Sequence, residues 1–227
     1  MFAPNRGILV RVFRLYVGND AGTCFTIEHN NEQFLVTAKH LFKKAGFPND
    51  FIVSILKDHS IVNLTCEIAC CIDPVDIAVL KPNPSVLISP ISPVVFKLGG
   101  AKLGEEAGFL GYPFDFDPVL RILPTTVNPI PFFKHAYISC FLDEQTIALD
   151  GINNPGFSGS PAFRMDGGNT IIFGVISGYR YVPSVVYKEE GDKETNTGLY
   201  VKENTGIVYV YSIQKVLDLL EEKWPSK

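Results

Sequence analysis

Short apolar segments separated by polar turns dominate the first part of the chain. The run 8–16 is rich in β-branched and aromatic residues and ends at the turn Gly18-Asn19-Asp20, which predicts a strand and its turn. The tripeptide His29-Asn30-Asn31 is a hairpin signal between two further predicted strands. The other segments that we predict to be strands in this part are 22–28, 33–37, 51–56, 64–71 and 77–80.

The second part repeats this pattern after a connector. Residues 81–93 contain four prolines, which suit an extended connector and exclude a central strand. Further strands are predicted at 108–112, 121–127, 136–142, 170–177 and 206–211. The polar run 187–198 is expected to be a solvated, mobile loop. Apolar residues at helical spacing after Ser212 predict one C-terminal helix, so the pattern indicates an all-β barrel or sandwich closed by a helix.

Composition narrows the choice of partners. Of the 227 residues, 46% are hydrophobic and 19% charged, as in a folded globular protein. The net charge of -4 gives no general attraction to phosphate backbones or anionic lipids, so no nucleic acid and no membrane partner is expected. The first residues do not resemble a secretion signal, and five irregularly spaced cysteines argue against a disulfide framework. These features favour a cytoplasmic protein. Cys66, Cys70 and Cys71 lack a second cluster with zinc spacing and are expected to be small buried hydrophobic residues.

The stretch Gly156-Phe157-Ser158-Gly159-Ser160-Pro161 is the strongest candidate for chemistry. Two glycines bracket a serine, so the backbone can turn tightly and present one hydroxyl outward. Such a turn also directs backbone N–H groups toward one point, where the oxygen of an attacked carbonyl collects negative charge. A serine hydroxyl needs a base to become a nucleophile, so the prediction requires a histidine elsewhere.

His40 is the best candidate for that base. The chain has four histidines, all before Ser158, so any triad runs with histidine first. His29 and His59 lie in polar, turn-like stretches that favour a solvated surface role, and His135 fits either a surface or a groove. His40 follows the predicted strand 34–38, which gives the imidazole a rigid support. The acid that orients it is expected at Asp76, before the predicted strand 77–80, with Asp73 as the rival.

These motifs together resemble those of the trypsin-like (chymotrypsin-fold) serine peptidases, closest to the bacterial disulfide-free members. The matching segments occur in the family's order and span most of the chain: Gly22-Thr23-Cys24-Phe25, Val36-Thr37-Ala38-Lys39-His40, Asp76-Ile77-Ala78-Val79-Leu80, Gly111-Tyr112-Pro113, the turn around Ser158, and Gly174-Val175-Ile176-Ser177-Gly178. The resemblance implies two packed antiparallel six-stranded β-barrels, one in residues 1–93 and one in residues 94–227, with the site between them.

The resemblance also implies roles for individual residues. Ser158 would attack a peptide carbonyl and His40 would accept its proton, while Asp76 orients the imidazole. The N–H groups of Gly156 and Ser158 would form the oxyanion hole. Ser177, with Gly178 in the same segment, would align the substrate backbone. No cofactor and no metal is implied.

Three positions depart from the family pattern, and a fourth, His135, bears on the substrate preference. Lys39 replaces the usual alanine beside the histidine and is expected to point to solvent. Phe157 replaces the acid that pairs with a freed N-terminus in the digestive members, so activation by that cleavage is not expected. Ile152 stands where trypsin carries its basic-selecting acid, which favours an uncharged or apolar residue in the specificity pocket. Relatives that select acidic residues use a histidine in the second barrel, and only His135 is available.

Three functions fit these residues. The first is a serine endopeptidase whose partner is a protein or peptide substrate, restrained by a regulatory partner protein. The second is a catalytically silent peptide-binding module of the same fold. The third is a hydrolase of another acyl substrate. The presence of all three triad residue types favours the enzyme, because a binding module does not need them.

Overall fold

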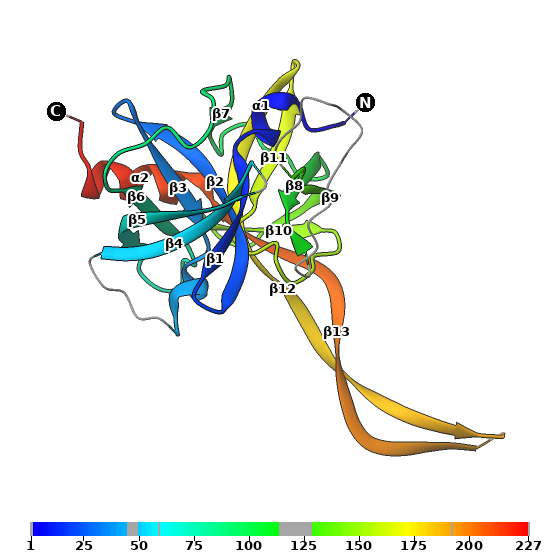
Figure 1. Cartoon of the computed structure of the whole chain (residues 1–227). Helices are drawn as coiled ribbons and strands as arrows, with labels where there is room; N and C mark the ends of the chain where they lie inside the picture. Colours follow the sequence, from blue (N-terminus) through cyan, green and yellow to red (C-terminus); the bar gives the residue numbers. More distant parts are fainter. Residues whose placement is uncertain (1, 45–49, 59, 114–128, 192, 227) are drawn as a thin grey trace.

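The first sheet of the protein closes on itself (Figure 1). The computed structural model describes residues 2–44, 50–58, 60–113, 129–191 and 193–226, so His59 and the strand predicted at 121–127 lie outside the described residues. In this sheet the strand order is β1-β2-β3-β6-β5-β4, all neighbours are antiparallel, and pairing of β1 with β4 completes the barrel. Its strands are β1 (Val12–Val17), β2 (Asp20–His29), β3 (Glu32–Thr37), β4 (Asp50–Lys57), β5 (Ser60–Cys70) and β6 (Ala78–Pro82).

The second sheet has the order β11-β8-β9-β10-β13-β12-β7. Because β11 also pairs with β12, six of these strands form a continuous antiparallel circuit. The remaining strand, β7, lies parallel to β12. The strands β7, β10 and β11 were not predicted. The strands are β7 (Val95–Phe96), β8 (Glu106–Gly111), β9 (Phe132–Phe141), β10 (Thr146–Asp150), β11 (Pro161–Asp166), β12 (Asn169–Glu190) and β13 (Lys193–Ser212).

Two helices flank the sheets. The prediction of one strand over 8–16 is wrong at its start, because α1 (Arg6–Leu9) precedes β1. The side chain of Asn5 accepts a hydrogen bond from the Ile8 N–H, which favours a helical turn there. The predicted C-terminal helix is confirmed as α2 (Ile213–Lys223), and the Ser212 hydroxyl accepts from the Gln214 N–H at its start.

The two sheets and α2 share one apolar core. Phe25 of β2, Phe163 of β11, Val175 of β12 and Val216 of α2 are all buried in the same cluster. Each barrel also has its own cluster, as the alternation of apolar and polar residues predicts. This shared core holds the facing ends of the two sheets in a fixed relation. Among the described residues, no helix is long and apolar enough to span a membrane.

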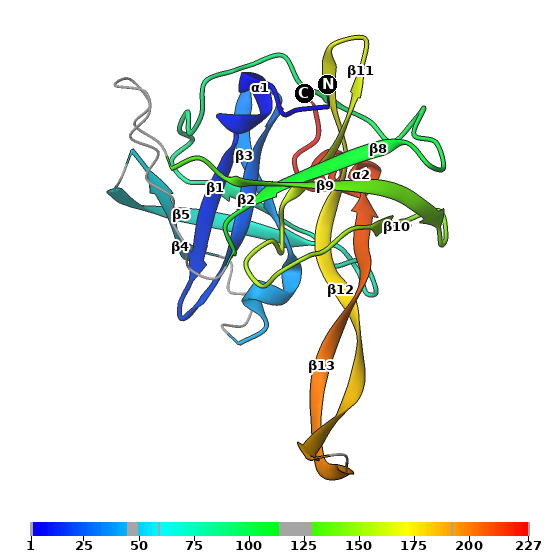
Figure 2. The same cartoon turned by 90° about the vertical axis from the view of Figure 1, so that its right-hand side faces the viewer.

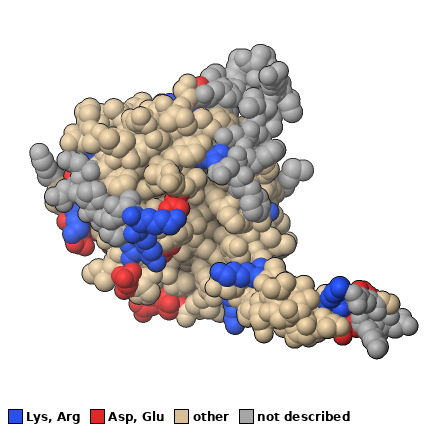
Figure 3. Space-filling model, turned by 60° about the horizontal axis from the view of Figure 1, so that its bottom comes forward, with Lys and Arg blue, Asp and Glu red and all other residues tan. Residues whose placement is uncertain are grey.

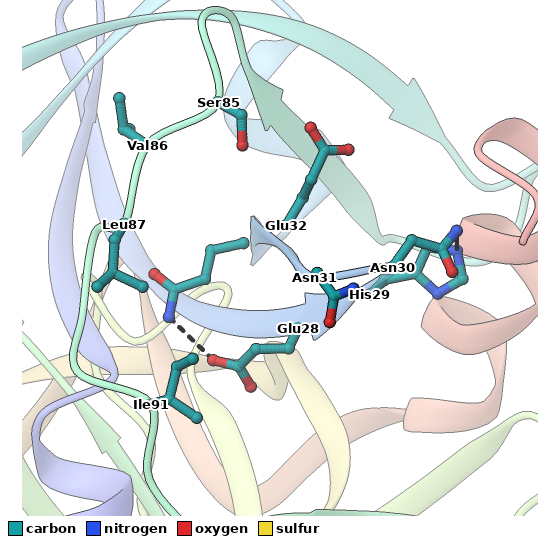
Figure 4. Close-up of a pocket in the computed structure, with 10 residues that line it drawn as sticks. Glu28, His29, Asn30, Asn31, Glu32, Ser85, Val86, Leu87 and Ile91 are labelled. Atoms are coloured by element: carbon teal, nitrogen blue, oxygen red, sulfur yellow. Dashed lines mark hydrogen bonds between the residues drawn. The ribbon is translucent and has the colours of Figure 1, made fainter.

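The proline-rich connector is held against the first barrel by Gln33. The Gln33 side-chain oxygen accepts from the N–H groups of Ile88 and Ser89, and its amide donates to Glu28. A hollow beside these contacts is shown in Figure 4. The lining side chains include Glu28, Asn30 and Leu87. Since the polar groups of Gln33 are used to anchor the connector, we assign this hollow a structural role.

The polar run 187–198 is not a loop, contrary to the prediction. Strands β12 and β13 remain paired from Gly174 and Ser212 as far as Glu190 and Lys193. They form a two-stranded ribbon that projects from the body of the molecule in both views (Figures 1 and 2). Apolar residues that precede and follow the polar run, such as Val185, continue the two strands outward, and backbone pairing then extends into the polar tip. The prediction considered only the polar run and therefore missed the ribbon.

Candidate active site

His40, Asp76 and Ser158 line one cleft, although they are distant in sequence. His40 lies in the 3-10 helix η1 (Lys39–Phe42) directly after β3, Asp76 lies just before β6, and Ser158 lies before β11. The cleft has a volume of about 540 Å³ and is also lined by Ser177 and Gly178 of β12. The structure therefore brings together five of the predicted site residues.

Asp76 holds both the backbone and the ring of His40. One carboxylate oxygen accepts from the His40 N–H at 2.8 Å, and the other lies 2.6 Å from Nδ1 of the ring. The Ser177 hydroxyl donates to that second oxygen at 2.5 Å. Because the Asp76 carboxylate accepts on both oxygens, the Nδ1 atom carries the proton and Nε2 is left free to act as a base.

The environment of Asp76 favours its ionised form. Burial by itself raises the pKa of this carboxyl, but the hydrogen bond from the His40 ring and its charge lower it, as do the Ser177 hydroxyl and the His40 N–H. The net result is a pKa below the ordinary value. Asp76 is thus suited to remain a carboxylate behind the imidazole.

Asp73, the rival acid, binds a different partner. Its carboxylate accepts from the Lys39 ammonium at 2.7 Å, and the Cys71 carbonyl accepts from the same group at 2.9 Å. The prediction that Lys39 points to solvent is therefore wrong, since only 11% of its side chain is exposed. The hydrogen bond and charge of Lys39 lower the pKa of the Asp73 carboxyl. Neutralisation by Asp73 keeps the Lys39 charge from acting unopposed on His40.

The backbone around Ser158 requires glycine on both sides. Gly156 has a φ of +102° and Gly159 a φ of +87°, in the left-handed region that L residues rarely adopt. A Cβ atom on Gly156 would lie 2.2 Å from the Tyr112 carbonyl oxygen, and one on Gly159 would lie 2.1 Å from that of Thr23. The glycines therefore provide both the turn and the close approach of neighbouring backbone.

Two backbone donors of this turn are unused by the described part of the chain. The Phe157 N–H donates to the Asn154 carbonyl and the Gly159 N–H to the Ile176 carbonyl. The N–H groups of Gly156 and Ser158 have no acceptor within the described residues. Buried or partly buried N–H groups normally find a partner, so these two are available to a ligand oxygen.

The Ser158 hydroxyl donates to the Ser177 carbonyl oxygen at 3.0 Å. No hydrogen bond joins this hydroxyl to His40 in the described contacts. A serine hydroxyl has one proton to donate, so the hydroxyl must rotate away from Ser177 before His40 can accept that proton. Catalytic hydrogen bonds are commonly formed only when substrate is bound.

Comparison with known proteins supports the fold. No protein-family model and no curated protein sequence matches the chain. The solved structure of the Rv3671c protease in its inactive form matches 95% of this chain and 89% of that chain, with a TM-score of 0.59 and 16% sequence identity. The chain has the fold of the trypsin-like serine proteases.

Two further structures of this fold are similar. The HtrA-type protease AlgW, solved with a tripeptide, matches 95% of this chain with a TM-score of 0.58 and 17% identity. A serine endoprotease from Yersinia pestis matches 97% with a TM-score of 0.60 and 13% identity. The chain covers 60% of AlgW and 67% of the Yersinia protein, so both are longer than the shared fold.

Within this trypsin-like fold, Thr23 is a site residue that the sequence reasoning did not single out. It is fully buried on β2. Its N–H donates to the Ser158 carbonyl at 2.9 Å, and its hydroxyl donates to the Gly156 carbonyl at 2.8 Å and accepts from the Tyr112 N–H at 3.1 Å. The available signal in the sequence was the hydroxyl of Thr23. It lies within the motif Gly22-Thr23-Cys24-Phe25, among the apolar residues of the predicted strand 22–28.

Neither Phe157 nor Ile152 lines the cleft. Phe157 is fully buried, and its ring lies edge-on to Phe109 with centroids 5.2 Å apart, so the position that holds an acid in the digestive proteases serves here as core. Ile152 is 62% exposed and is not among the residues that line the cleft with Ser158. The structure does not bring Ile152 to the other site residues.

The other described histidines do not reach the cleft. The His29 ring bonds to the Trp224 carbonyl at 2.7 Å, so it anchors the end of α2 rather than facing solvent as predicted. His135 lies on β9, 40% exposed, with its Nε2 atom 3.5 Å from Glu106. Because His135 is absent from the lining of the cleft, it does not serve there as a selector of acidic residues.

All five cysteines are free thiols. Burial raises the pKa of Cys24 strongly and that of Cys66 to about 12, so these two thiols are inert apolar residues, as predicted for Cys66. Cys70 and Cys71 are only partly buried, which differs from the prediction, and Cys140 is exposed. The described residues contain no cluster of three or more potential metal ligands.

Proposed function

We propose that this chain is a serine endopeptidase that cleaves peptide bonds through an acyl-enzyme intermediate. The observation that carries the proposal is the His40–Asp76 pair, which shares a cleft with a serine on a glycine-bounded turn that has two unused N–H groups. The base with its acid, the serine and the two N–H groups each have a separate role in acyl transfer. A purely structural role for one of these groups would not explain why all of them meet in one cleft.

In the proposed acylation, Ser158 Oγ adds to the carbonyl carbon of the substrate while its proton passes to His40 Nε2. The carbonyl oxygen receives the electron pair, and the N–H groups of Gly156 and Ser158 donate to it. When that oxygen re-forms its double bond, the bond from carbon to the leaving nitrogen breaks, and His40 gives the proton to this nitrogen. Water then attacks the ester in the same way and restores Ser158.

Asp76 is proposed to act by position and charge. Its hydrogen bonds to the His40 ring and backbone keep the imidazole in the tautomer that leaves Nε2 unprotonated. Its carboxylate stabilises the imidazolium that forms during the reaction. The Ser177 hydroxyl, which donates to Asp76, fixes the carboxylate and is a positioning group in addition to any contact with substrate.

The cleft favours cleavage next to an uncharged residue. Its acidic lining residues, Asp73 and Asp76, are already paired with Lys39 and His40. No carboxylate remains among the described lining residues to select a basic side chain. We therefore propose that the specificity pocket accepts an uncharged or apolar residue. The sequence suggested the same preference from Ile152, but Ile152 does not line this cleft.

The second candidate is a silent peptide-binding module, and the hydrogen bond from Ser158 to the Ser177 carbonyl favours it, because that hydroxyl is not directed at His40. A fluorophosphonate probe, which reacts with activated serine hydroxyls, separates the two. We expect stoichiometric labelling of the wild-type chain at Ser158 and none of Ser158→Ala. If wild type remains unlabelled while a control peptidase is labelled, the silent module is correct.

Hydrolysis of peptides and of other acyl substrates uses the same labelled serine, so a second measurement is needed. We expect the chain to cleave internal amide bonds in a mixture of unstructured peptides, with new termini detected by mass spectrometry. Labelling without any such cleavage, together with turnover of a simple ester, would instead favour an acyl hydrolase. A regulatory partner is tested by comparing labelling rates before and after the chain is purified away from bound proteins.

A further inference from the structure

The ribbon formed by β12 and β13 has an open edge that begins beside Ser158. On the barrel, β12 pairs with β11 and β7 along one edge and with β13 along the other. Beyond Ile176, only the edge toward β13 is paired within the described residues. An isolated two-stranded ribbon is only marginally stable in water, and an open edge is a ready template for another extended chain. The open edge of the ribbon is therefore suited to binding another polypeptide.

One face of the ribbon is defined by residues that are partners across its two strands. Pro183 pairs with Lys202, and Val185 pairs with Tyr200. Tyr181 lies on the same side, because the Lys202 ammonium is 4.6 Å from the centroid of its ring. We call this the aromatic face of the ribbon. Tyr181 is 49% exposed and Tyr200 is 68% exposed, so large apolar surfaces are open to a partner.

The opposite face carries a different set of residues. Val182 pairs with Glu203 and Ser184 with Val201, and the Ser184 hydroxyl bonds to the Glu203 carboxylate. This face has no aromatic ring among these four residues. It provides matched control positions for the aromatic face.

The aromatic face is continuous with the proposed catalytic cleft. The residues that line the cleft with His40 and Ser158 include Tyr179, Tyr181 and Lys202 at the base of the ribbon. Figure 3 shows the ribbon extending from the body of the molecule, with basic side chains at its base and on the nearby body. A polypeptide in the cleft that continues in an extended conformation therefore meets the aromatic face next.

The charge at the base of the ribbon, away from the scissile bond, favours an acidic side chain of the ligand. Lys39 is neutralised by Asp73, and Asp76 is engaged with His40. Lys43 also lines the cleft, and its charge acts on Asp73 as well. Lys202 lines the cleft without a carboxylate partner in the described contacts. An ammonium without a carboxylate partner next to exposed aromatic rings suits a segment with acidic and apolar side chains.

We propose that the aromatic face is an additional substrate-binding surface for an extended polypeptide with an acidic residue next to Lys202. The inference rests on the proposed function for its direction. Strand β12 runs outward from Ser177, so a segment that pairs antiparallel with its open edge runs inward toward Ser158. The residues that contact the ribbon thus precede the scissile bond. Their alternate side chains lie over Tyr181 and Val185 of β12, with the Tyr200 ring beside Val185 on the paired strand.

Binding to the Ser158→Ala chain tests the inference without depending on turnover. A degenerate library of fluorescent peptides is passed over the immobilised full chain, and the bound peptides are sequenced. Each peptide has about nine residues, which span ~30 Å when extended. We expect enrichment of peptides with acidic residues. In fluorescence anisotropy, Tyr200→Ala should weaken the Kd of enriched peptides about tenfold, whereas Val201→Ala on the opposite face should change it less than about twofold. Lys202→Glu should abolish the enrichment of acidic residues.

The outcomes separate this inference from the proposed function. Equal Kd values for Tyr200→Ala, Val201→Ala and the parent chain would overturn the inference. So would sedimentation showing that Tyr200→Ala converts a dimer to a monomer, because a second copy of the chain would then cover the face. Failure of fluorophosphonate labelling with retained ribbon-dependent binding would instead overturn catalysis and support the binding surface. Circular dichroism confirms that each variant is folded.

Discussion

Thr23 and Gly156, 133 residues apart, are joined by a hydrogen bond of 2.8 Å from the Thr23 hydroxyl to the Gly156 carbonyl. Thr23 belongs to the first barrel and Gly156 to the turn that presents Ser158. A second hydrogen bond runs from the Thr23 N–H to the Ser158 carbonyl. Both accepting carbonyls belong to residues whose N–H groups are the proposed oxyanion donors. The first barrel therefore fixes the peptide unit that follows each donor, so packing between the two sheets controls the shape of the reactive turn.

Replacing Thr23 by valine should loosen this turn. The substitution keeps the shape of the side chain but removes the hydroxyl that donates to the partly buried Gly156 carbonyl, at a cost of ~1–3 kcal/mol. We expect the rate of fluorophosphonate labelling to fall about tenfold. Thr23→Ser, which retains the hydroxyl, should label within about twofold of wild type. If both variants label equally slowly, the hydroxyl is not what positions the turn.

Asp76 and Asp73 should differ sharply when each is changed to asparagine. Asp76→Asn retains the size of the side chain but disturbs the tautomer of His40, so turnover should fall by ~10³-fold or more. Asp73→Asn removes an exposed partner of Lys39 and should change the free energy of unfolding little. Steady-state kinetics on a cleaved peptide and urea unfolding measure both effects. A comparable loss of turnover in the two variants would contradict the assignment of Asp76.

Gly156→Ala should destabilise the turn that presents Ser158. The new Cβ atom would lie 2.2 Å from the Tyr112 carbonyl oxygen, and the residue would have to keep a φ of +102°. We expect a loss of more than ~1 kcal/mol in the free energy of unfolding, and a greater loss in labelling rate than in stability. Gly99→Ala is the matched control, since its Cβ would meet no atom within 4 Å. Equal melting temperatures for wild type and Gly156→Ala would refute the proposed strain.

The lowered pKa of Asp76 predicts a specific dependence of stability on pH. Because its pKa in the folded state is below the ordinary value of about 3.9, Asp76 stabilises the fold at pH values above ~4. This stabilisation is lost as the pH falls through the folded-state pKa. Urea unfolding across this acidic range should show a smaller decline for Asp76→Asn than for wild type. Parallel curves would mean that Asp76 has the same pKa in both states.

Local sequence patterns were sufficient for much of the fold. The hairpin at Asn30-Asn31 is confirmed, with both residues in the left-handed region, because asparagine tolerates that conformation in a tight turn. The C-terminal helix is confirmed because its cap at Ser212 and its apolar spacing lie within the helix itself. The strand predicted over 8–16 failed at its start, since one side chain, Asn5, was enough to favour a helical turn.

Side-chain partners were harder to predict. The sequence favoured Asp76 over Asp73, and the structure places Asp76 against His40, but it gave no sign that Lys39 would be buried against Asp73. A lysine beside a histidine reads as exposed, because burial of its charge is costly unless a carboxylate is present. That carboxylate is supplied by a residue 34 positions away.

By itself the sequence determined the alternation that makes strands, the two glycines that allow the Ser158 turn, and the order of histidine, acid and serine. These depend on backbone sterics and on spacing between near neighbours, which the chain carries locally. Only the tertiary structure decided that Thr23 holds the Ser158 turn and that β12 and β13 continue outward as a paired ribbon. Both depend on the register of strands and on the packing of two sheets, and contacts between distant residues form only when the barrels close.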